Sequence, residues 1–283
     1  FQKGFSQPMV VLVDGLDESL HHRGDVTIPM LLSRLGSLPP QVRFILTSRP
    51  EPRVENEIPD ADSLFLSAVK FDQNNRKDIK TYVEWRFRED QDLEKVVAQA
   101  GPAKVSASVA TITHKSEGNF RYVTFLLDAM AKGQRGLEDL EGIPAGLDGL
   151  YSDSLKRVVD LGKKDWASTY APFLGVLSVA QSSLTAAQIK AFSGLAEGTV
   201  WGCLGDLQQF IELLGAEEGK GEDQYRFYHQ SVIDFLHSRQ LNVEKKKLHN
   251  LYYLAPKEWH QRLAGFYLQK GPHSWVQWEE YGL

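Results

Sequence analysis

The sequence predicts an α/β domain with parallel strands at its N-terminal end, followed by parts that are mainly helical. The first observation is a continuous apolar, β-branched run from Met9 to Val13, typical of a strand buried on both faces of a parallel sheet. The second is a helical spacing of apolar residues from Ile28 to Leu38, closed by two prolines. The third is a further apolar run, Val42 to Leu46, with another at Leu64 to Val69. A strand, a helix and further strands in this order predict parallel pairing through right-handed crossovers.

The composition is that of an ordinary globular protein. Its 283 residues, 42% of them hydrophobic, are enough for about two domains with a full core. A formal net charge of -5 gives no overall basic field, so we expect neither DNA nor a membrane surface as a partner. No apolar run approaches the roughly 20 residues of a membrane-spanning helix. A single cysteine forms no internal disulfide, which fits a reducing compartment, and we expect a cytoplasmic protein.

The first region, 1–71, is followed by a predicted helical subdomain, 72–141. Apolar side chains recur at helical spacing from Ile79 to Phe87 and again from Phe120 to Met130. A connector, 142–169, comes next. It begins with a stretch that contains glycine and proline and leads into a helix from about Leu150 to Leu161.

Residues 170–241 are predicted to form a winged-helix domain. An apolar helix runs from Phe173 to Val179. A second helix begins at Thr185, since Gln188 stands three residues later as in a capping box, and this helix ends at Gly194.

The rest of this domain is predicted from turn and cap residues. A third helix, Thr199 to Gln209, precedes two strands on either side of a glycine-rich turn from Gly215 to Gly221. Ser231, with Asp234 three residues later, is predicted to cap the last helix. Residues 242–283 are aromatic and helical, and we expect them to start a further helical region that links to repeats.

Polar residues follow the ends of the first two predicted strands. Asp14 ends one strand, and Thr47, Ser48 and Arg49 end the next. Because ligands of open α/β sheets bind beyond the carboxyl ends of the strands, we expect these groups to meet at one edge. Mg²⁺ takes oxygen ligands and usually keeps several waters, so the carboxylate of Asp14 alone can hold it.

Neighbouring residues supply the other groups that phosphoryl transfer needs. Asp17 and Glu18 are placed to orient an attacking water, and Arg49, a permanently charged fork, suits a γ-phosphate oxygen. The alternative is structural: Asp14 and Asp17 would cap the following helix, and Arg49 would pair with a surface carboxylate. The two motifs, in this order on adjacent strands, favour the phosphoryl-transfer site.

Five segments together resemble a known family. The segment VVLVDGLDE looks like the Walker B motif of NACHT-type ATPases, which belong to the STAND class of P-loop signalling NTPases, and FILTSRP resembles their sensor motif. The segments SEGNF, IPAGLDGLY and FYHQSVIDFL follow in the order expected of this family. The chain is most similar to bacterial and fungal members that carry C-terminal WD-type or other repeats. The resemblance implies that residues 1–71 are the C-terminal half of a P-loop NTPase core.

The resemblance also implies ligands and roles. The cofactors would be ATP or ADP with Mg²⁺: Asp14 would hold the metal, Asp17 and Glu18 would supply the hydrolytic carboxylates, and Arg49 with Thr47 would sense the γ-phosphate. Pro144 is similar to a proline that packs near the adenine. His229 resembles a winged-helix histidine that contacts the β-phosphate of ADP, although the family's Met-His-Asp is Tyr-His-Gln here. The alternative for His229 is a histidine satisfied at a strand-to-helix junction, where a helix N-terminus also favours anions.

The phosphate-binding loop of such an enzyme does not occur in the sequence. It reads G-x-x-x-x-G-K-[ST], and the nearest segment, Gly215 to Gly221, is one residue short and lacks the final Ser or Thr. We interpret that segment as the wing turn and expect the loop to lie before Phe1, with both ends being cuts in a longer polypeptide. We therefore expect the isolated chain to bind nucleotide poorly and to hydrolyse no ATP.

The predicted function is a nucleotide-dependent switch. ADP would hold the parts closed, and exchange for ATP would release them for self-association, with unknown protein partners bound through absent C-terminal repeats. One alternative is a nonenzymatic interaction scaffold. A winged-helix DNA-binding regulator is a weaker one, because the third helix has no Lys or Arg and the range 171–240 carries four basic and eight acidic residues.

Overall fold

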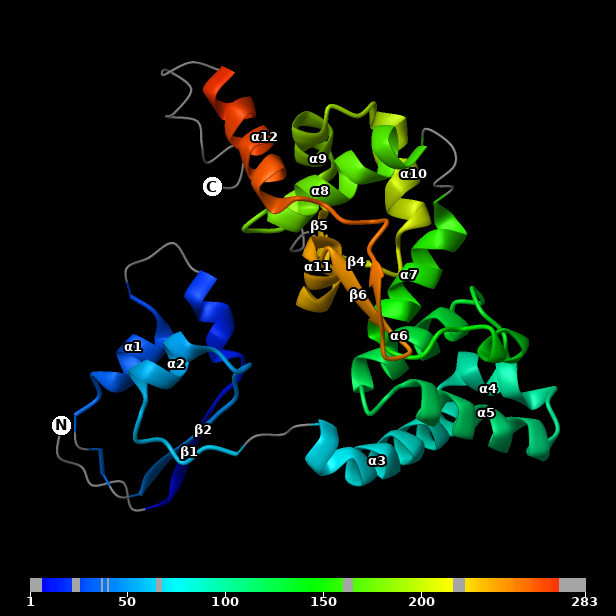
Figure 1. Cartoon of the computed structure of the whole chain (residues 1–283), viewed down its shortest axis with the longest axis horizontal. Coiled ribbons are helices and arrows are strands. Elements are labelled where there is room, and N and C mark those ends of the chain that lie inside the picture. The colour runs from blue at the N-terminus through cyan, green and yellow to red at the C-terminus, as the bar shows by residue number, and fades with distance from the viewer. Residues whose placement is uncertain are drawn as a thin grey trace. The chain divides into compact units, whose positions relative to one another are not determined.

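The computed structural model describes residues 7–21, 26–36, 38–39, 41–64, 68–159, 165–215 and 222–269. The chain divides into two compact units, 1–66 and 67–283 (Figure 1). The expected boundary at residue 71 falls inside helix α3, Ala68–Glu89. The other four expected regions all lie in the second unit.

The first unit is built on two parallel strands, as the sequence predicts. β1, Met9–Val13, pairs along its whole length with β2, Val42–Leu46. Between the strands come a 3-10 helix, η1, Leu16–His21, and α1, Ile28–Ser33. A further short helix, α2, Pro52–Glu57, follows β2.

Two expectations for this unit are wrong in part. The helix expected to reach Leu38 ends at Ser33. Leu35 and Leu38 are both exposed, so burial of their side chains does not stabilise a further turn. A strand was expected from Leu64 to Val69, but Leu64 is irregular and α3 has begun at Ala68, while residues 65–67 lie outside the described part.

The strands are not buried on both faces, contrary to the prediction. One face carries Val11, Val13 and Phe44, which are half-buried. The other face, which we call the bare face, carries Val10, Leu12 and Ile45, whose exposed fractions are 60%, 67% and 55%. A sheet of two strands with two short helices has too few elements to cover both of its faces.

The second unit opens with a helical bundle, as expected for the helical subdomain. After α3 come α4, α5 and α6, whose bounds are Gln91–Ala98, Pro102–Lys115 and Phe120–Ala131. Ile79, Val83 and Phe87 form the buried face of α3, and the buried side chains of α6 include the predicted Val123, Leu126, Leu127 and Met130. The side chains of Asp90 and Asn119 accept backbone N–H groups at the starts of α4 and α6 and so cap these helices.

A 3-10 helix, η2, Leu137–Glu141, ends the expected helical subdomain, and the connector holds the helix α7, Leu147–Val158. α7 starts three residues before the expected Leu150, and residues 160–164 lie outside the described part. α7 packs against α6 and also contacts later elements of the unit. Arg135, just before η2, is buried, and its guanidinium contacts the Asp153 carboxylate and the Ser154 hydroxyl of α7, both at 2.8 Å. The connector is therefore tied to the bundle core.

The next part contains three helices and a small antiparallel sheet. A π-helical turn, η3, Trp166–Tyr170, leads directly into α8, Ala171–Val179. The strands β3, β4 and β5 are Leu184–Thr185, Ile211–Leu214 and Gln224–Phe227, in the sheet order β3-β5-β4. Between β3 and β4 lie α9, Ala186–Ser193, and α10, Glu197–Asp206. The predicted capping box of Thr185 and Gln188 is confirmed, and so is the end of α9 at Gly194, whose φ is 72°.

The chain ends, as far as it is described, in a helix, a hairpin and a last helix. α11, Gln230–His237, is followed by strands β6, Gln240–Val243, and β7, Lys246–His249. The expectation of helix throughout 242–283 is wrong for this hairpin. Its turn residues Glu244 and Lys245 both have positive φ, 50° and 64°, so the chain reverses without a glycine.

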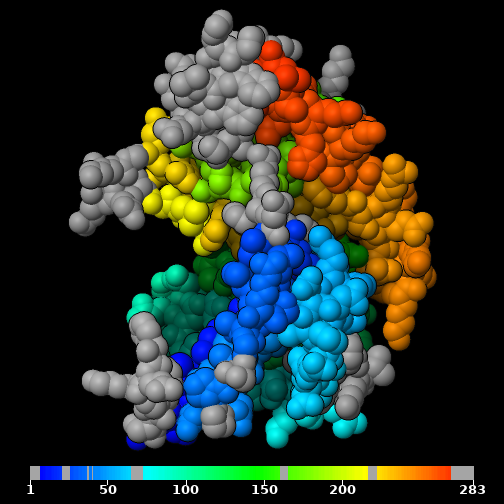
Figure 2. Space-filling model, turned by 90° about the vertical axis from the view of Figure 1, so that its left-hand side faces the viewer, coloured from blue at the N-terminus to red at the C-terminus, as the bar shows by residue number. Residues whose placement is uncertain are grey.

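α12, Pro256–Gln269, packs on α8 and α9 and forms a red patch on the outer surface of the second unit (Figure 2). Its Trp259 lies directly on Gly175 of α8, where a Cβ would be 2.2 Å from the indole. Phe266 meets Phe192 edge to face at 5.1 Å between ring centres. Through these contacts the aromatic side chains of α12 pack on α8 and α9. None of the helices within the described residues is both long and apolar enough to cross a membrane.

Candidate functional site

The carboxyl edge of β1 and β2 brings Asp14 and Thr47 together, as the sequence predicts. The Thr47 backbone N–H donates to the Val13 carbonyl at 3.0 Å, which places Thr47 level with the end of β1. Its hydroxyl donates to Asp14 Oδ1 and accepts the Gly15 backbone N–H at 2.9 Å. Thr47 thus holds the Asp14 carboxylate at the sheet edge, where that carboxylate is exposed.

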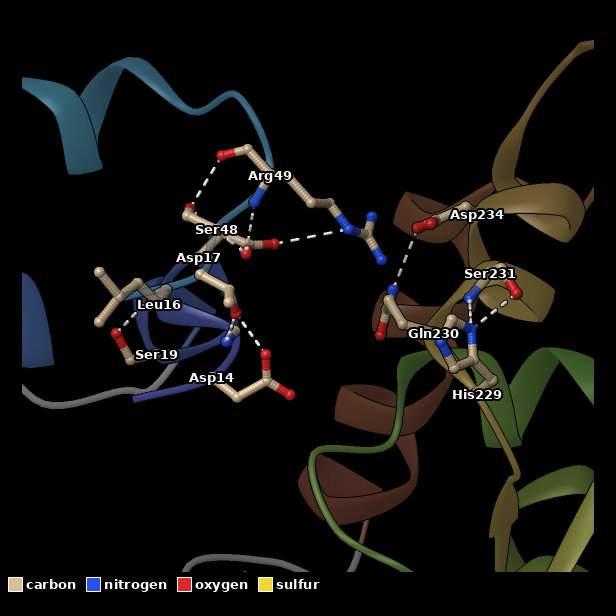
Figure 3. A network of polar contacts seen from close by, with 12 residues as sticks. Asp14, Leu16, Asp17, Ser19, Ser48, Arg49, His229, Gln230, Ser231 and Asp234 are labelled. Carbon is tan, nitrogen blue, oxygen red and sulfur yellow. Dashed lines mark hydrogen bonds and ion pairs between the residues drawn. The ribbon is translucent and has the colours of Figure 1, made fainter. Parts of the chain in front are cut away.

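Asp17 holds the segment that follows β2 (Figure 3). Its Oδ1 accepts the Arg49 backbone N–H at 3.0 Å and lies 3.4 Å from the Ser48 hydroxyl. Its Oδ2 lies 3.5 Å from Arg49 Nε, and the side chain of Asp17 is only 13% exposed against 49% for Arg49. Asp17 therefore sets both the backbone position and the starting direction of the Arg49 side chain.

Glu18 stands at the start of η1, one residue beyond Asp17. Its backbone N–H donates to the Gly15 carbonyl at 2.9 Å, and its side chain is exposed. This tight turn requires glycine, since Gly15 has a φ of +67° and a Cβ there would lie 3.2 Å from Glu18 Cδ. The turn keeps Asp14, Asp17 and Glu18 at one edge of the sheet.

The donors at this edge fit a magnesium ion better than a transition metal. In the described part of the chain, no three His, Cys, Asp or Glu side chains gather into a metal site. Mg²⁺ needs no such cluster, because it is commonly held by one or two carboxylates together with waters and substrate phosphates. The exposed Asp14 carboxylate beside the Thr47 hydroxyl offers oxygen donors of that kind.

Pro144 lies in a braced loop between η2 and α7. Lys115 Nζ donates to three backbone carbonyls of this segment, the last being that of Ile143 at 2.6 Å. The Tyr122 hydroxyl donates to the Pro144 carbonyl at 3.2 Å. Gly149, one turn into α7, leaves no room for a side chain, because a Cβ there would be 2.7 Å from Pro144 Cβ. The proline is therefore fixed by contacts with α5, α6 and α7.

The hairpin β6–β7 also supports this loop. The Asn242 backbone N–H donates to Asp148 Oδ2 at 2.8 Å, and Val243 Cγ1 would lie 3.2 Å from a Cβ on Gly149. The segment after α11 is thereby linked to the start of α7. A contact between partners 94 residues apart has no local pattern that would predict it.

His229 is the N-cap residue of α11, so the prediction that Ser231 caps this helix is wrong. His229 Nδ1 accepts the Ser231 backbone N–H at 3.0 Å and lies 2.7 Å from the Ser231 hydroxyl (Figure 3). Ser231 instead lies in the first turn of the helix. The imidazole reaches the free N–H groups at the helix start, which is the satisfied strand-to-helix histidine considered as an alternative. Capping uses Nδ1 of the imidazole.

A partly buried hydroxyl network extends from this cap into α7. The Tyr151 hydroxyl lies 2.9 Å from Ser231 Oγ and 2.7 Å from the Tyr228 hydroxyl. Tyr151 and Tyr228 both belong to segments that carry the family resemblance, but their contact joins positions 77 residues apart. No local pattern in the sequence predicts it.

His237, at the end of α11, makes stability depend on pH. Burial lowers the pKa of its imidazole below the usual 6.5, and its buried Nε2 has no hydrogen-bond partner among the described residues. The unfolded chain then binds a proton more readily than the folded chain, so stability is full above about pH 6.5 and falls as the pH drops below it. We expect His237→Gln to lose less unfolding free energy between about pH 7 and pH 5 than the unchanged chain, in urea unfolding at both pH values. Equal losses would contradict this role of His237.

The predicted site residues fall into two groups. Asp14, Asp17, Glu18, Thr47 and Arg49 gather at one sheet edge of the first unit. Pro144 and His229 belong to the second unit, where α7 and its contacts connect them. No protein-family model matches the sequence, and no solved structure matches the chain significantly.

Proposed function

We propose that this chain is the Walker B, sensor and lid part of a nucleotide-dependent signalling switch of the NACHT type, within the STAND class of NTPases. The observation that carries the proposal is the pairing of Asp14 with Thr47 across adjacent parallel strands, with Arg49 held next to them by Asp17. Walker B and sensor residues need this geometry, because the metal and the γ-phosphate lie at the same sheet edge.

Each residue then has a role that its contacts allow. Asp14 holds Mg²⁺, and Arg49 with Thr47 senses the γ-phosphate. Asp17, whose two oxygens already face Arg49, contributes by fixing that arginine. Glu18, the exposed carboxylate, orients the attacking water. The loop that grips the phosphates is supplied by sequence outside this chain, and the bare face is covered by further elements of the same core.

The second unit supports the lid assignment. Its element order from α8 to β5 and its sheet order β3-β5-β4 support the winged-helix part of the proposal. His229 lies at the junction that leads from β5 into α11, where we propose that it contacts the β-phosphate of ADP, and Pro144 packs near the adenine. Exchange of ADP for ATP removes these contacts and permits self-association.

DNA recognition by this winged helix is disfavoured by charge. A groove of about 570 Å³ lies beside α10, the helix that would enter DNA. Its charged lining is Glu197, Glu222 and Asp223 against Lys190, and Lys190 is itself paired with Glu197 at 3.1 Å. Phosphate contacts require the opposite sign.

The test is nucleotide turnover in the natural protein that contains this chain. We expect ADP to be released when the purified protein is denatured, and ATP turnover to fall about 100-fold or more in Glu18→Gln, because the water loses its orienting carboxylate. Glu55→Gln, an exposed carboxylate on α2 of the same unit, is the matched control and should leave turnover unchanged. Turnover is measured as phosphate release, and bound nucleotide by chromatography.

The 283-residue chain alone provides the complementary measurement. We expect no ATP turnover from it. Turnover by the isolated chain that disappears in Glu18→Gln would show that the phosphate-binding loop is not needed. Equal turnover of Glu18→Gln and Glu55→Gln in the natural protein would remove the proposed role of Glu18.

A further inference from the structure

The hydroxyl network beside His229 has a direction that can be worked out from its donors. His229 Nδ1 accepts the Ser231 backbone N–H at 3.0 Å, and a backbone N–H can only donate. Nδ1 therefore carries no hydrogen. The Ser231 hydroxyl, 2.7 Å from the same nitrogen, must then also donate to it.

The remaining links follow one after another. Ser231 has a single hydroxyl hydrogen, which is directed to Nδ1, so at 2.9 Å the Tyr151 hydroxyl must be the donor to Ser231. Tyr151 has then used its only hydrogen, so at 2.7 Å the Tyr228 hydroxyl must donate to Tyr151. Three hydroxyl hydrogens serve three links, and all of them point towards the imidazole.

We infer that Tyr228, Tyr151 and Ser231 are positioning residues that fix His229 as the tautomer with its hydrogen on Nε2, and so present a neutral N–H donor to the anionic oxygen of a bound nucleotide. The inference rests on the proposed function for its ligand, but the tautomer itself does not depend on that function. Successive donors polarise one another, so hydrogen bonds onto Nδ1 strengthen the donor at Nε2. An outer group that fixes one ring nitrogen commonly sets the task of the other.

Packing keeps the network in place. Tyr151 is fully buried, and burial raises the pKa of both phenols, so both remain protonated donors. The Phe125 ring of α6 meets the Tyr151 ring edge to face at 5.0 Å and stacks on the Tyr228 ring at 5.9 Å. The Arg121 guanidinium lies over the Tyr228 ring, 5.4 Å from the ring centre. Three elements, α6, α7 and the start of α11, thus determine the orientation of one imidazole.

The same helix also serves the other proposed contact with the nucleotide. α7 begins next to the Pro144 loop, and its Gly149 packs on Pro144, two residues before Tyr151. The base contact and the phosphate contact of the proposed site are therefore carried by one helix. Movement of α7 would change both contacts together.

The tautomer is measured on the 283-residue chain without nucleotide, by long-range ¹H–¹⁵N correlation of the imidazole at about pH 8, above the ordinary histidine pKa. The His229 signals are assigned by their loss in His229→Gln. We expect a hydrogen on Nε2 and a bare, hydrogen-bonded Nδ1. Ser231→Ala should move the Nδ1 resonance towards that of a free acceptor, Tyr151→Phe should move it less in the same direction, and Ser231→Thr should restore it.

Tyr225→Phe is the control, since it removes the hydroxyl of a buried tyrosine of β5 that lies outside the network. The His229 signals should not move in this variant. A hydrogen on Nδ1 in the unchanged chain would overturn the inference, and this measurement requires no variant. An Nδ1 resonance that is the same in Ser231→Ala, in Tyr151→Phe and in the unchanged chain would overturn it as well.

The ligand is tested separately, with ADP and the natural protein. We expect Tyr151→Phe to weaken ADP binding about tenfold, the lower end of the effect that loss of an outer hydrogen-bond partner has at metal-ligating histidines. If the natural protein binds no ADP while the imidazole spectra are as expected, the proposed function fails and the tautomer assignment stands. If ADP binds equally well to Tyr151→Phe and to the unchanged protein, the positioning role of Tyr151 is overturned.

Discussion

Replacement of Asp153 by alanine is expected to lower the free energy of unfolding of the second unit by about 3–5 kcal/mol. The cost comes from Arg135, which would stay buried without its carboxylate partner. The Arg135 side chain is only 2% exposed and pairs with Asp153 at 2.8 Å, and its Nη1 already has no hydrogen-bond partner in the described part of the chain. Without the carboxylate, the buried guanidinium would keep the Ser154 hydroxyl as its one side-chain hydrogen-bond partner among the described residues.

Urea unfolding followed by circular dichroism measures this effect. Asp92→Ala is the matched control, because Asp92 is 62% exposed and pairs with an exposed lysine, and exposed pairs contribute about 0–1 kcal/mol. Arg135→Met should lower the free energy of unfolding less than Asp153→Ala does. The Asp153 carboxylate that it leaves behind is 25% exposed and keeps a contact with Arg157 at 3.5 Å. If Asp153→Ala were no more destabilising than Asp92→Ala, the ion pair would not support the connector.

Gly175→Ala is expected to displace α12 and to lower the free energy of unfolding by about 1–3 kcal/mol, as overpacking of a core does. A Cβ at this position would lie 2.2 Å from Trp259 Cε2 and 2.3 Å from Cδ2, inside the ring rather than against a flexible side chain. The indole must move away from α8, and α12 moves with it. Faster hydrogen exchange and earlier proteolytic cleavage within α12 would report the displacement.

Gly202→Ala, in the same unit, is expected to raise the free energy of unfolding instead of lowering it. Gly202 is also inside a helix, α10, but a Cβ there would have no neighbour within 4 Å. Alanine should therefore stabilise α10 by about 0.5–1 kcal/mol through its better helix propensity. If both variants changed stability by the same amount and in the same direction, the close contact between Gly175 and Trp259 would not be the cause.

The sequence predicted the elements whose signals are local. The apolar runs gave β1 and β2 at their observed bounds, and the Thr185 capping box gave the start of α9. The meeting of Asp14 with Thr47 was also predictable, because parallel strands bring their carboxyl ends to one edge. In these cases the residue pattern alone decides the local structure.

The predictions are wrong where contacts between distant residues, an unusual turn or an unusual cap determine the structure. The apolar pattern of Val10 and Leu12 predicts burial, but it does not say which element provides the cover. The hairpin β6–β7 was missed because its turn, Glu244-Lys245, lacks the usual glycine or asparagine. Ser231 is a common cap residue, and only the structure shows that the imidazole of His229 takes its place.

The candidate site was predicted less completely than the fold. Residues that would touch ligand stand in short motifs, whereas those that hold them come from elsewhere in the chain. Lys115 binds the Ile143 carbonyl from 28 positions away, and Tyr151 meets Ser231 across 80. Such supports depend on tertiary packing, so no spacing rule identifies them.

The bare face has a consequence for how the sheet edge is ordered. Among the residues described in the first unit, Leu16, Pro29 and Val54 are buried, which is a small core for an independent fold. Burying each of the side chains of Val10, Leu12 and Ile45 would contribute about 1.5–3 kcal/mol. In the NTPase core that we propose, the elements that cover this face would therefore supply a large part of the folding free energy of this unit. Assembly of that core and ordering of the Asp14 edge would then be one coupled equilibrium, in which docking on one face of the sheet completes the proposed site at its end.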